Sequence, residues 1–221
     1  MQKTSKALLI AIFLFTFVGA AFAAGFTVDD LSTSKIGKFP SRWRTWPLQR
    51  SAAERVYAVA EENGKRFVQA KDESNESQQI FLNFHWDIKQ YPDLKWKWRA
   101  TKLPEGAKES DDSLNDSACA IYVVVGKYTG NALKYAWSTT LPVGQIVTRR
   151  DGKLKIKIVD SGSAKVGKWV DQERNVLSDY KEAFGEDLGK DPSGIAILTD
   201  GNAVQKPSGC DYMDIAVGPA S

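Results

Sequence analysis

The dominant pattern along this chain is an alternation of apolar and polar residues with a period of two. It is clearest at 94–99, where Leu94, Trp96 and Trp98 alternate with basic residues, and at 153–158, where three aliphatic residues alternate with three lysines. Such alternation is typical of a strand that buries one face, so both segments are predicted to present their lysines outward. Further strands are predicted at 26–31, 55–60, 65–70, 79–88, 117–125, 133–138, 194–199 and 212–217. These short strands, separated by turn sequences such as Asn63-Gly64, predict an all-β fold built as an antiparallel β-sandwich.

One segment has the period of a helix instead. Asn175 is a suitable N-cap, and Gly185 stands where a left-handed residue would end the helix. The apolar residues between them are Val176, Leu177, Tyr180, Ala183 and Phe184. The spacing predicts one short amphipathic helix at about 175–184 that packs on an edge or an open end of the sandwich.

The N-terminus has the features of a cleaved signal peptide. Lys3 and Lys6 precede an apolar run at 7–18, and 21–23 reads Ala-Phe-Ala, the small-x-small pattern that signal peptidase cuts. We therefore expect residues 1–23 to be removed and 24–221 to form a single β-sandwich domain, periplasmic or secreted. No later run is long and apolar enough to span a membrane.

Composition gives no sign of a polyelectrolyte partner. The 30 Lys and Arg residues nearly balance the 27 Asp and Glu residues, for a formal net charge of +3. A charge this small does not indicate a nucleic-acid partner. The oligomeric state is left undecided by the sequence.

The two cysteines could pair in an oxidising compartment. Strand parity argues against a bond between Cys119 and Cys210, because Cys119 shares a face with Ile121 whereas Cys210 is out of register with Ile215 and Val217. The pairing is still allowed if Cys210 precedes its strand.

The single histidine limits the catalytic chemistry that this chain can offer. His85 falls on the polar side of its predicted strand with Asn83 and Asp87, which favours a surface position. One His and two separated Cys exclude the usual zinc spacings and every His-dependent triad not built on His85. No glycine-rich phosphate loop follows a strand, so nucleotide binding has no support.

Tryptophans and lysines each allow two interpretations. Trp43, Trp46 and Trp169 lie in loop-like sequence and are candidates for a sugar-stacking platform, although burial under a loop explains them equally well. Basic residues at 95, 97 and 99 and at 153, 155 and 157 would form one basic face if both strands lay in the same sheet. Solubility and edge protection are the favoured explanation of these side chains.

The remaining candidate chemistry is carboxylate. Asp116, Asp179, Asp200 and Asp214 each lie in or beside a predicted strand or helix, where a glycosidase pair or a calcium site could be assembled. Turn and capping roles account for most aspartates of this kind. A calcium site stays an alternative without a supporting motif, and no cofactor is predicted.

Several short motifs together resemble a known family. They are LKWKWR at 94–99, NDSACAIYVV at 115–124, LKYAW at 133–137, WVDQERNVLSDY at 169–180, FG at 184–185, IAILTDGN at 195–202 and YMDI at 212–215. Their order and spacing resemble the exported bacterial family catalogued as domain of unknown function 3047. The resemblance implies a jelly-roll sandwich of the kind that recurs in carbohydrate-binding modules.

The resemblance also implies a set of ligand-binding positions. The polar motif positions of the family fall on Asp116, Arg174, Asn175, Asp179, Tyr180, Asp200, Asn202 and Asp214. The chain departs from the family where Asn115 replaces an aspartate and Ala120 replaces an arginine, which weighs slightly against catalysis. We expect Arg174 to bond a strand-end carboxylate such as Asp200.

We therefore expect a non-catalytic envelope protein that binds a cell-envelope glycan or another envelope component. The first alternative is a glycan hydrolase or lyase that uses Asp116, Asp179 or Asp200 with Tyr180 or Arg174. The second is a structural subunit that pairs through a sheet edge.

Overall fold

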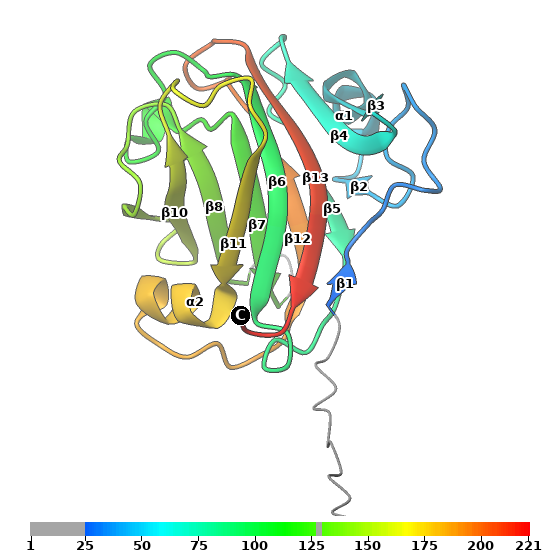
Figure 1. The fold of residues 1–221 in the computed structure, drawn as a ribbon. Coiled ribbons are helices and arrows are strands. Elements are labelled where there is room, and N and C mark those ends of the chain that lie inside the picture. Colours follow the sequence, from blue (N-terminus) through cyan, green and yellow to red (C-terminus); the bar gives the residue numbers. More distant parts are fainter. Residues whose placement is uncertain (1–24, 127–129) are drawn as a thin grey trace, which may run out of the picture.

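The computed structural model describes residues 25–126 and 130–221, so the expected signal peptide at 1–23 lies outside the described residues. Two sheets face each other as a β-sandwich of the jelly-roll type (Figure 1), which confirms the predicted fold class. The first sheet has the order β11 (Val170–Asn175), β6 (Asp93–Lys102), β13 (Ser208–Gly218), β4 (Lys65–Asp72) and β3 (Tyr57–Glu62), with β1 (Phe26–Thr27) paired to β13. We call it the six-stranded sheet.

The opposite sheet contains seven strands and carries the features discussed below. Its order is β2 (Arg44–Thr45), β5 (Gln79–Asn83), β12 (Pro192–Leu198), β7 (Cys119–Val125), β8 (Ala132–Ser138), β10 (Leu154–Ser161) and β9 (Ile146–Arg149). We call it the seven-stranded sheet. Most neighbouring strands are antiparallel, as predicted, whereas the pair β8 and β10 runs parallel.

The predicted helix is confirmed with its caps. It is α2 (Val176–Phe184); the Asn175 side chain accepts a hydrogen bond from the Ser178 backbone N–H at 3.0 Å, and Gly185 adopts a left-handed φ of 75°. In Figure 1 the helix lies at one end of the sandwich, beside the ends of β10 and β11.

Some predicted boundaries are wrong. A short helix, α1 (Arg50–Val56), precedes β3 where a strand was predicted from residue 55, and β5 ends at Asn83 rather than at 88. Strand β11 was missed because its sequence after Val170 is polar throughout. It is an edge strand paired only with β6, so it needs no buried apolar face.

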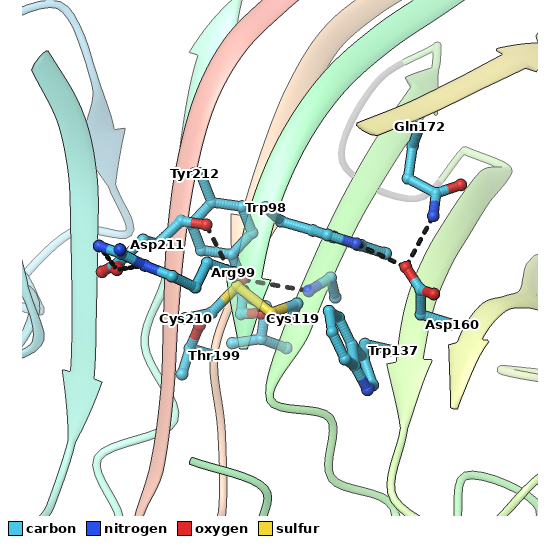
Figure 2. The surroundings of a disulfide bond; sticks show 12 residues. Trp98, Arg99, Cys119, Trp137, Asp160, Gln172, Thr199, Cys210, Asp211 and Tyr212 are labelled. Carbon is cyan, nitrogen blue, oxygen red and sulfur yellow. Dashed lines mark hydrogen bonds and ion pairs between the residues drawn. A yellow bond between two sulfur atoms is a disulfide. The ribbon is translucent and has the colours of Figure 1, made fainter. Parts of the chain in front are cut away.

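The core between the sheets is rich in aromatic residues. Trp96 and Trp98 on β6 are almost fully buried, and the Trp96 ring lies 5.3 Å from the Tyr135 ring on the opposite sheet. Trp98 donates from Nε1 to Asp160 Oδ2 at 2.9 Å, which satisfies its buried N–H (Figure 2). The predicted inward face of 94–99 is thus confirmed.

A disulfide joins Cys119 on β7 to Cys210 on β13 across the sandwich (Figure 2), so the parity argument against it is wrong. The reason is an irregularity in β13. Its register shifts between Met213 and Ala216, where Asp214 has a left-handed φ of 53°. One extra residue reverses the facing of a strand. Cys210 therefore points into the core although Ile215, an odd number of residues later, does too.

The two lysine-rich strands lie in different sheets, so they form no common basic face. The outward prediction for 153–158 is also wrong, because Lys157 is buried and its Nζ lies 2.7 Å from Asp179 Oδ1 on α2. The apolar residues of β10 instead face the other side of the sheet, away from the core, in a second hydrophobic cluster with Ala136 and Leu141.

Candidate functional site

A pocket of about 370 Å³ lies on the outer face of the seven-stranded sheet, the face turned away from the core. It spans β5, β12, β7 and the start of β8, and strand alternation sends a distinct set of side chains into it. We call it the outer-face pocket. The residues that matter below are Trp46, Gln79, Phe81, Asn83, His85, Tyr122, Ala132, Arg150, Ser193, Gly194 and Ala196.

Small residues make the floor of the outer-face pocket. Gly194 and Ala196 on β12 and Ala132 on β8 project little or nothing above the sheet, so the surface is hollow between larger neighbours. A Cβ at Gly194 would come within 2.8 Å of the Leu82 carbonyl oxygen. Glycine is therefore required there by the close approach of β5 and β12.

Aromatic side chains form one wall. Trp46 follows β2, which pairs with β5 through Arg44 and Thr45, and the indole is 38% exposed. The Trp46 and Phe81 rings lie 5.2 Å apart at 50° to each other. Tyr122, on the far side of β12, is largely buried but still reaches the pocket. The partly exposed indole and the half-buried phenyl ring together give the pocket an apolar wall.

Polar groups surround this surface. Gln79 and Asn83 project from the same face of β5 as Phe81, and His85 follows that strand. Ser193 Oγ is engaged with the Gly126 carbonyl oxygen at 2.5 Å. Arg150 comes from the turn between β9 and β10. The pocket thus combines aromatic faces with several hydrogen-bond donors and acceptors, the usual composition of a small-molecule site.

A buried polar cluster lies behind Tyr122. Lys134 Nζ donates to Ser117 Oγ at 3.0 Å and lies 5.6 Å from the Tyr122 ring centre. Glu109 accepts from Ser117 Oγ at 3.0 Å and from Ser138 Oγ at 2.5 Å. All of these side chains are buried; Glu109 and Ser117 come from the 102–118 segment, and Lys134 and Ser138 come from the outer face of β8.

Lys134 and Tyr122 in this cluster both stay protonated. Burial works to lower the pKa of Lys134, but Tyr122, Asp200 and Glu109 outweigh it and raise that pKa. Lys134 is therefore a stable ammonium group rather than a neutral amine that could accept a proton. Burial raises the pKa of the Tyr122 hydroxyl, so the phenol stays protonated beside Lys134.

The eight residues predicted from the family resemblance divide into three groups, none of which lines the outer-face pocket. Asp116, Asp200 and Asn202 belong to the first, at the turn after β12. Asp200 accepts from the Ser117 backbone N–H at 2.9 Å, and Asp116 accepts from the Val204 N–H at 2.8 Å. The Asn202 side chain is exposed.

Burial raises the pKa of Asp200 from 3.8 to about 7, against the opposing effects of Lys134 and the Ser117 N–H. Burial also raises the pKa of Asp116. These two carboxyls are held by backbone donors within a dry turn, where they tie the β12–β13 connection to the start of β7.

The second group is Arg174, Asn175, Asp179 and Tyr180, at the junction of β11 and α2. Arg174 binds Asp179 through two hydrogen bonds, Nε to Oδ2 at 2.8 Å and Nη2 to Oδ1 at 2.6 Å. The expected bond between Arg174 and Asp200 is therefore wrong. The carboxylate that Arg174 meets lies five residues away on the helix rather than at a strand end.

Asp179 also accepts from Lys157 at 2.7 Å. Burial of Asp179 works to raise its pKa, but the hydrogen bonds and charges of Arg174 and Lys157 outweigh burial and lower it. Asn175 donates to Asp93 at 2.8 Å, and the Tyr180 hydroxyl accepts from Asn131 at 2.8 Å. This group fastens α2 to both sheets.

The third group is Asp214 alone. It sits at the irregularity of β13, half exposed, with Lys97 Nζ 3.7 Å from its carboxylate. Contact of any of the eight residues with a ligand stays a prediction.

Of the three tryptophans considered for a platform, Trp46 alone is among the residues that line the outer-face pocket. Trp43 is buried and donates to Asp29 at 2.9 Å, as the burial interpretation expects. Trp169 packs against the Arg99 guanidinium, which lies 4.5 Å from its ring centre.

The described part of the chain contains no group of three or more His, Cys, Asp and Glu residues arranged to hold a metal ion. Within residues 25–126 and 130–221, no helix is both long and apolar enough to cross a membrane.

Comparison with known families decides the relationship of the chain. The model of the family described as "Protein of unknown function (DUF3047)" matches residues 41–216, which is most of the sequence. The chain belongs to this family. The match covers the outer-face pocket of this DUF3047 protein and both sheets from β2 to β13. Among curated proteins, no relative matches the chain.

Solved structures similar to this DUF3047 protein include both binding modules and enzymes. The family 11 carbohydrate-binding module of the cellulase Lic26A-Cel5E of Clostridium thermocellum has a TM-score of 0.44 and 9% identity, covering 89% of this chain and 95% of that one. TmCBM61 in complex with β-1,4-galactotriose has a TM-score of 0.38 and 14% identity, covering 83% and 92%.

The xyloglucanase domain of NopAA from Sinorhizobium fredii, in complex with cellobiose, has a TM-score of 0.40 and 7% identity, covering 82% and 100%. At these scores the likeness says nothing of what the DUF3047 protein binds.

The sequence analysis missed most of the outer-face pocket, including the placement of His85 in its lining. The available signal was parity: Gln79, Phe81 and Asn83 alternate with the core residues Ile80 and Leu82. Sequence alone does not show that β5 and β7 flank the same glycine-bearing strand.

Proposed function

We propose that this protein is an exported, non-catalytic binding protein whose ligand is a glycan that occupies the outer-face pocket. The observation that carries the proposal is the exposed Trp46 indole beside Phe81, with hydrogen-bonding side chains around both. A sugar ring has apolar C–H faces and a rim of hydroxyls, so it needs flat apolar surface and surrounding donors and acceptors together. The pocket offers both within one hollow.

The hydrolase alternative finds little support in the composition of the pocket. Glycoside hydrolysis generally needs two carboxyl groups on either side of the scissile bond. Among the described residues that line the outer-face pocket, none is Asp or Glu. Asp116 and Asp200, which were candidates for such a pair, are buried and engaged by backbone N–H groups instead.

Export is part of the proposal. The N-terminal sequence has the basic start, apolar run and small-x-small site of a signal peptide. A disulfide between two buried cysteines suits an oxidising compartment such as the periplasm or the cell exterior. We expect mass spectrometry of the extracytoplasmic fraction to find an N-terminus at residue 24.

The binding proposal is tested with the mature chain, residues 24–221, and a panel of envelope and plant cell-wall oligosaccharides. A ligand present at about 100 times its Kd should raise the free energy of unfolding by roughly 2.7 kcal/mol, measured as a thermal shift. Isothermal titration calorimetry then compares the wild type with two variants. Trp46→Ala should weaken binding by about tenfold or more, which corresponds to about 1.4 kcal/mol.

Trp169→Ala is the matched control, because Trp169 is a partly exposed indole that packs on Arg99 of the six-stranded sheet. It should bind as the wild type does. A panel without any ligand, or equal binding by both variants, would overturn the proposed site. Release of shortened sugars from a bound glycan would overturn the non-catalytic assignment.

A further inference from the structure

Arg150 is unusual among the arginines of this protein because its charge is unmatched. Of the nine arginines in the sequence, seven form ion pairs with other described residues, and Arg44 and Arg150 form none with them. Within the described residues the Arg150 guanidinium has no hydrogen bond either, and it lines the outer-face pocket. Five free N–H donors therefore stand at the wall of this hollow.

The backbone holds Arg150 in this place at an energetic cost. Arg150 and Asp151 both have a left-handed φ of 51°, and Gly152 has a φ of 90°. A left-handed conformation is unfavourable for a residue that is not glycine. Asp151 and Gly152 are typical turn residues, so the turn accounts for their presence. The turn does not require an arginine at position 150.

The neighbouring arginine anchors the turn. Arg149 Nη1 forms an ion pair with Asp112, and Nη2 donates to the Asp111 carbonyl oxygen at 2.9 Å. Adjacent arginines thus have different surroundings: Arg149 fastens the turn to the 102–118 segment, and Arg150 is left facing the pocket.

The electrostatics of the pocket favour an anion. Among the described lining residues none is acidic, and Arg150 is the one arginine or lysine. Asp151 is exposed and lies outside the lining. The ammonium of Lys134 behind Tyr122 is balanced by Glu109 within the buried polar cluster. The unbalanced charge that a ligand meets is therefore positive.

Sheet order places this charge opposite the aromatic wall. Trp46 follows β2 at one edge of the seven-stranded sheet, whereas Arg150 precedes β10 near the other edge. A ligand in the pocket can contact aromatic rings on one side and a guanidinium on the other.

We propose that the ligand is an anionic saccharide, with a carboxylate or sulfate group of one sugar unit bound by the Arg150 guanidinium. The inference rests on the proposed function and names its substrate class. The planar guanidinium matches two oxygens of such a group through parallel hydrogen bonds, which an ammonium cannot reproduce. The sugar ring then lies toward Trp46 and Phe81.

The test compares charged and neutral forms of one sugar backbone by calorimetry. Oligogalacturonate, its methyl ester, and a sulfated oligosaccharide are titrated into the wild type, Arg150→Gln, Arg150→Lys and Lys102→Gln. Lys102 is an exposed cation on β6 of the opposite sheet, so Lys102→Gln removes the same charge away from the pocket.

The wild type should bind an acidic form about tenfold or more tightly than the neutral ester, and this preference should weaken as salt is added. Arg150→Gln should abolish the preference without changing ester binding, Arg150→Lys should keep part of it, and Lys102→Gln should keep all of it. Preference for the carboxylated or the sulfated form identifies which oxyanion is recognised.

The experiment distinguishes failure of the anionic ligand class from failure of the proposed function. If the neutral ester binds as tightly as the acids and Arg150→Gln changes nothing, the anionic ligand class is refuted while the proposed function stands. If no saccharide of either kind binds, the proposed function itself is refuted.

Discussion

The disulfide between Cys119 and Cys210 offers the sharpest test of how this sandwich is stabilised. It links the two sheets, both sulfurs are buried, and the cysteines are separated by 91 residues in the sequence. Removing the cross-link frees a long loop in the unfolded chain. For a loop of this length the chain-entropy relation gives roughly 4.6 kcal/mol at 25 °C, near the upper end of measured values.

We expect the double variant Cys119→Ala/Cys210→Ala to lose about 3–5 kcal/mol of the free energy of unfolding. Guanidinium unfolding followed by tryptophan fluorescence measures the loss. The slope m should increase, because the unfolded chain without a cross-link exposes more surface. Wild-type protein unfolded with a thiol reductant is the control, since it loses the cross-link but keeps both sulfur atoms.

Agreement between the reduced wild type and the double variant would assign the effect to the cross-link rather than to lost packing atoms. A loss below about 1 kcal/mol in both would refute the loop-entropy argument.

Three further results are expected. Trp96→Ala should cost about 3–5 kcal/mol in denaturant melts because it empties the core, whereas Lys97→Ala should cost well under about 1 kcal/mol; equal losses would mean that the faces of β6 are reversed. A double-mutant cycle should return a coupling of at least about 0.5 kcal/mol between Arg174→Ala and Asp179→Ala, and near additivity between Arg174→Ala and Asp200→Ala. Since Asp200 titrates at about 7 when folded and near 3.8 when unfolded, the folded state holds the extra proton between these values. The free energy of unfolding should therefore fall as pH rises from about 4 to about 7, and Asp200→Asn should show less of this slope in melts across that range.

The fold was largely predictable because its signals are local. Alternation at 94–99 correctly identified the inward Trp96 and Trp98, and the cap and stop residues correctly bounded α2. Each of these depends on residues that are neighbours along the chain, so sequence alone contains the information.

The wrong predictions concern strand irregularity, side-chain partners and strand order, which the hydrophobic pattern does not record. The facing of Cys210 is reversed by a single irregular residue near Asp214, which leaves no mark in the hydrophobic pattern. Arg174 was expected to bind a carboxylate at a strand end, but it binds Asp179, five residues later on α2. The outer-face pocket depends on strand order, which brings β5, β12 and β7 together although they are far apart in sequence.

The small residues at the floor of the outer-face pocket allow the volume of the pocket to change independently of the packing between the two sheets. Ala132 and Ala196 face away from the layer between the sheets, so a larger side chain at either would take volume from the pocket and leave the core unchanged. Gly194 does not have this freedom, because its neighbour strand lies too close for any Cβ. The size of ligand that fits can therefore be changed at two positions that do not contact the core between the sheets.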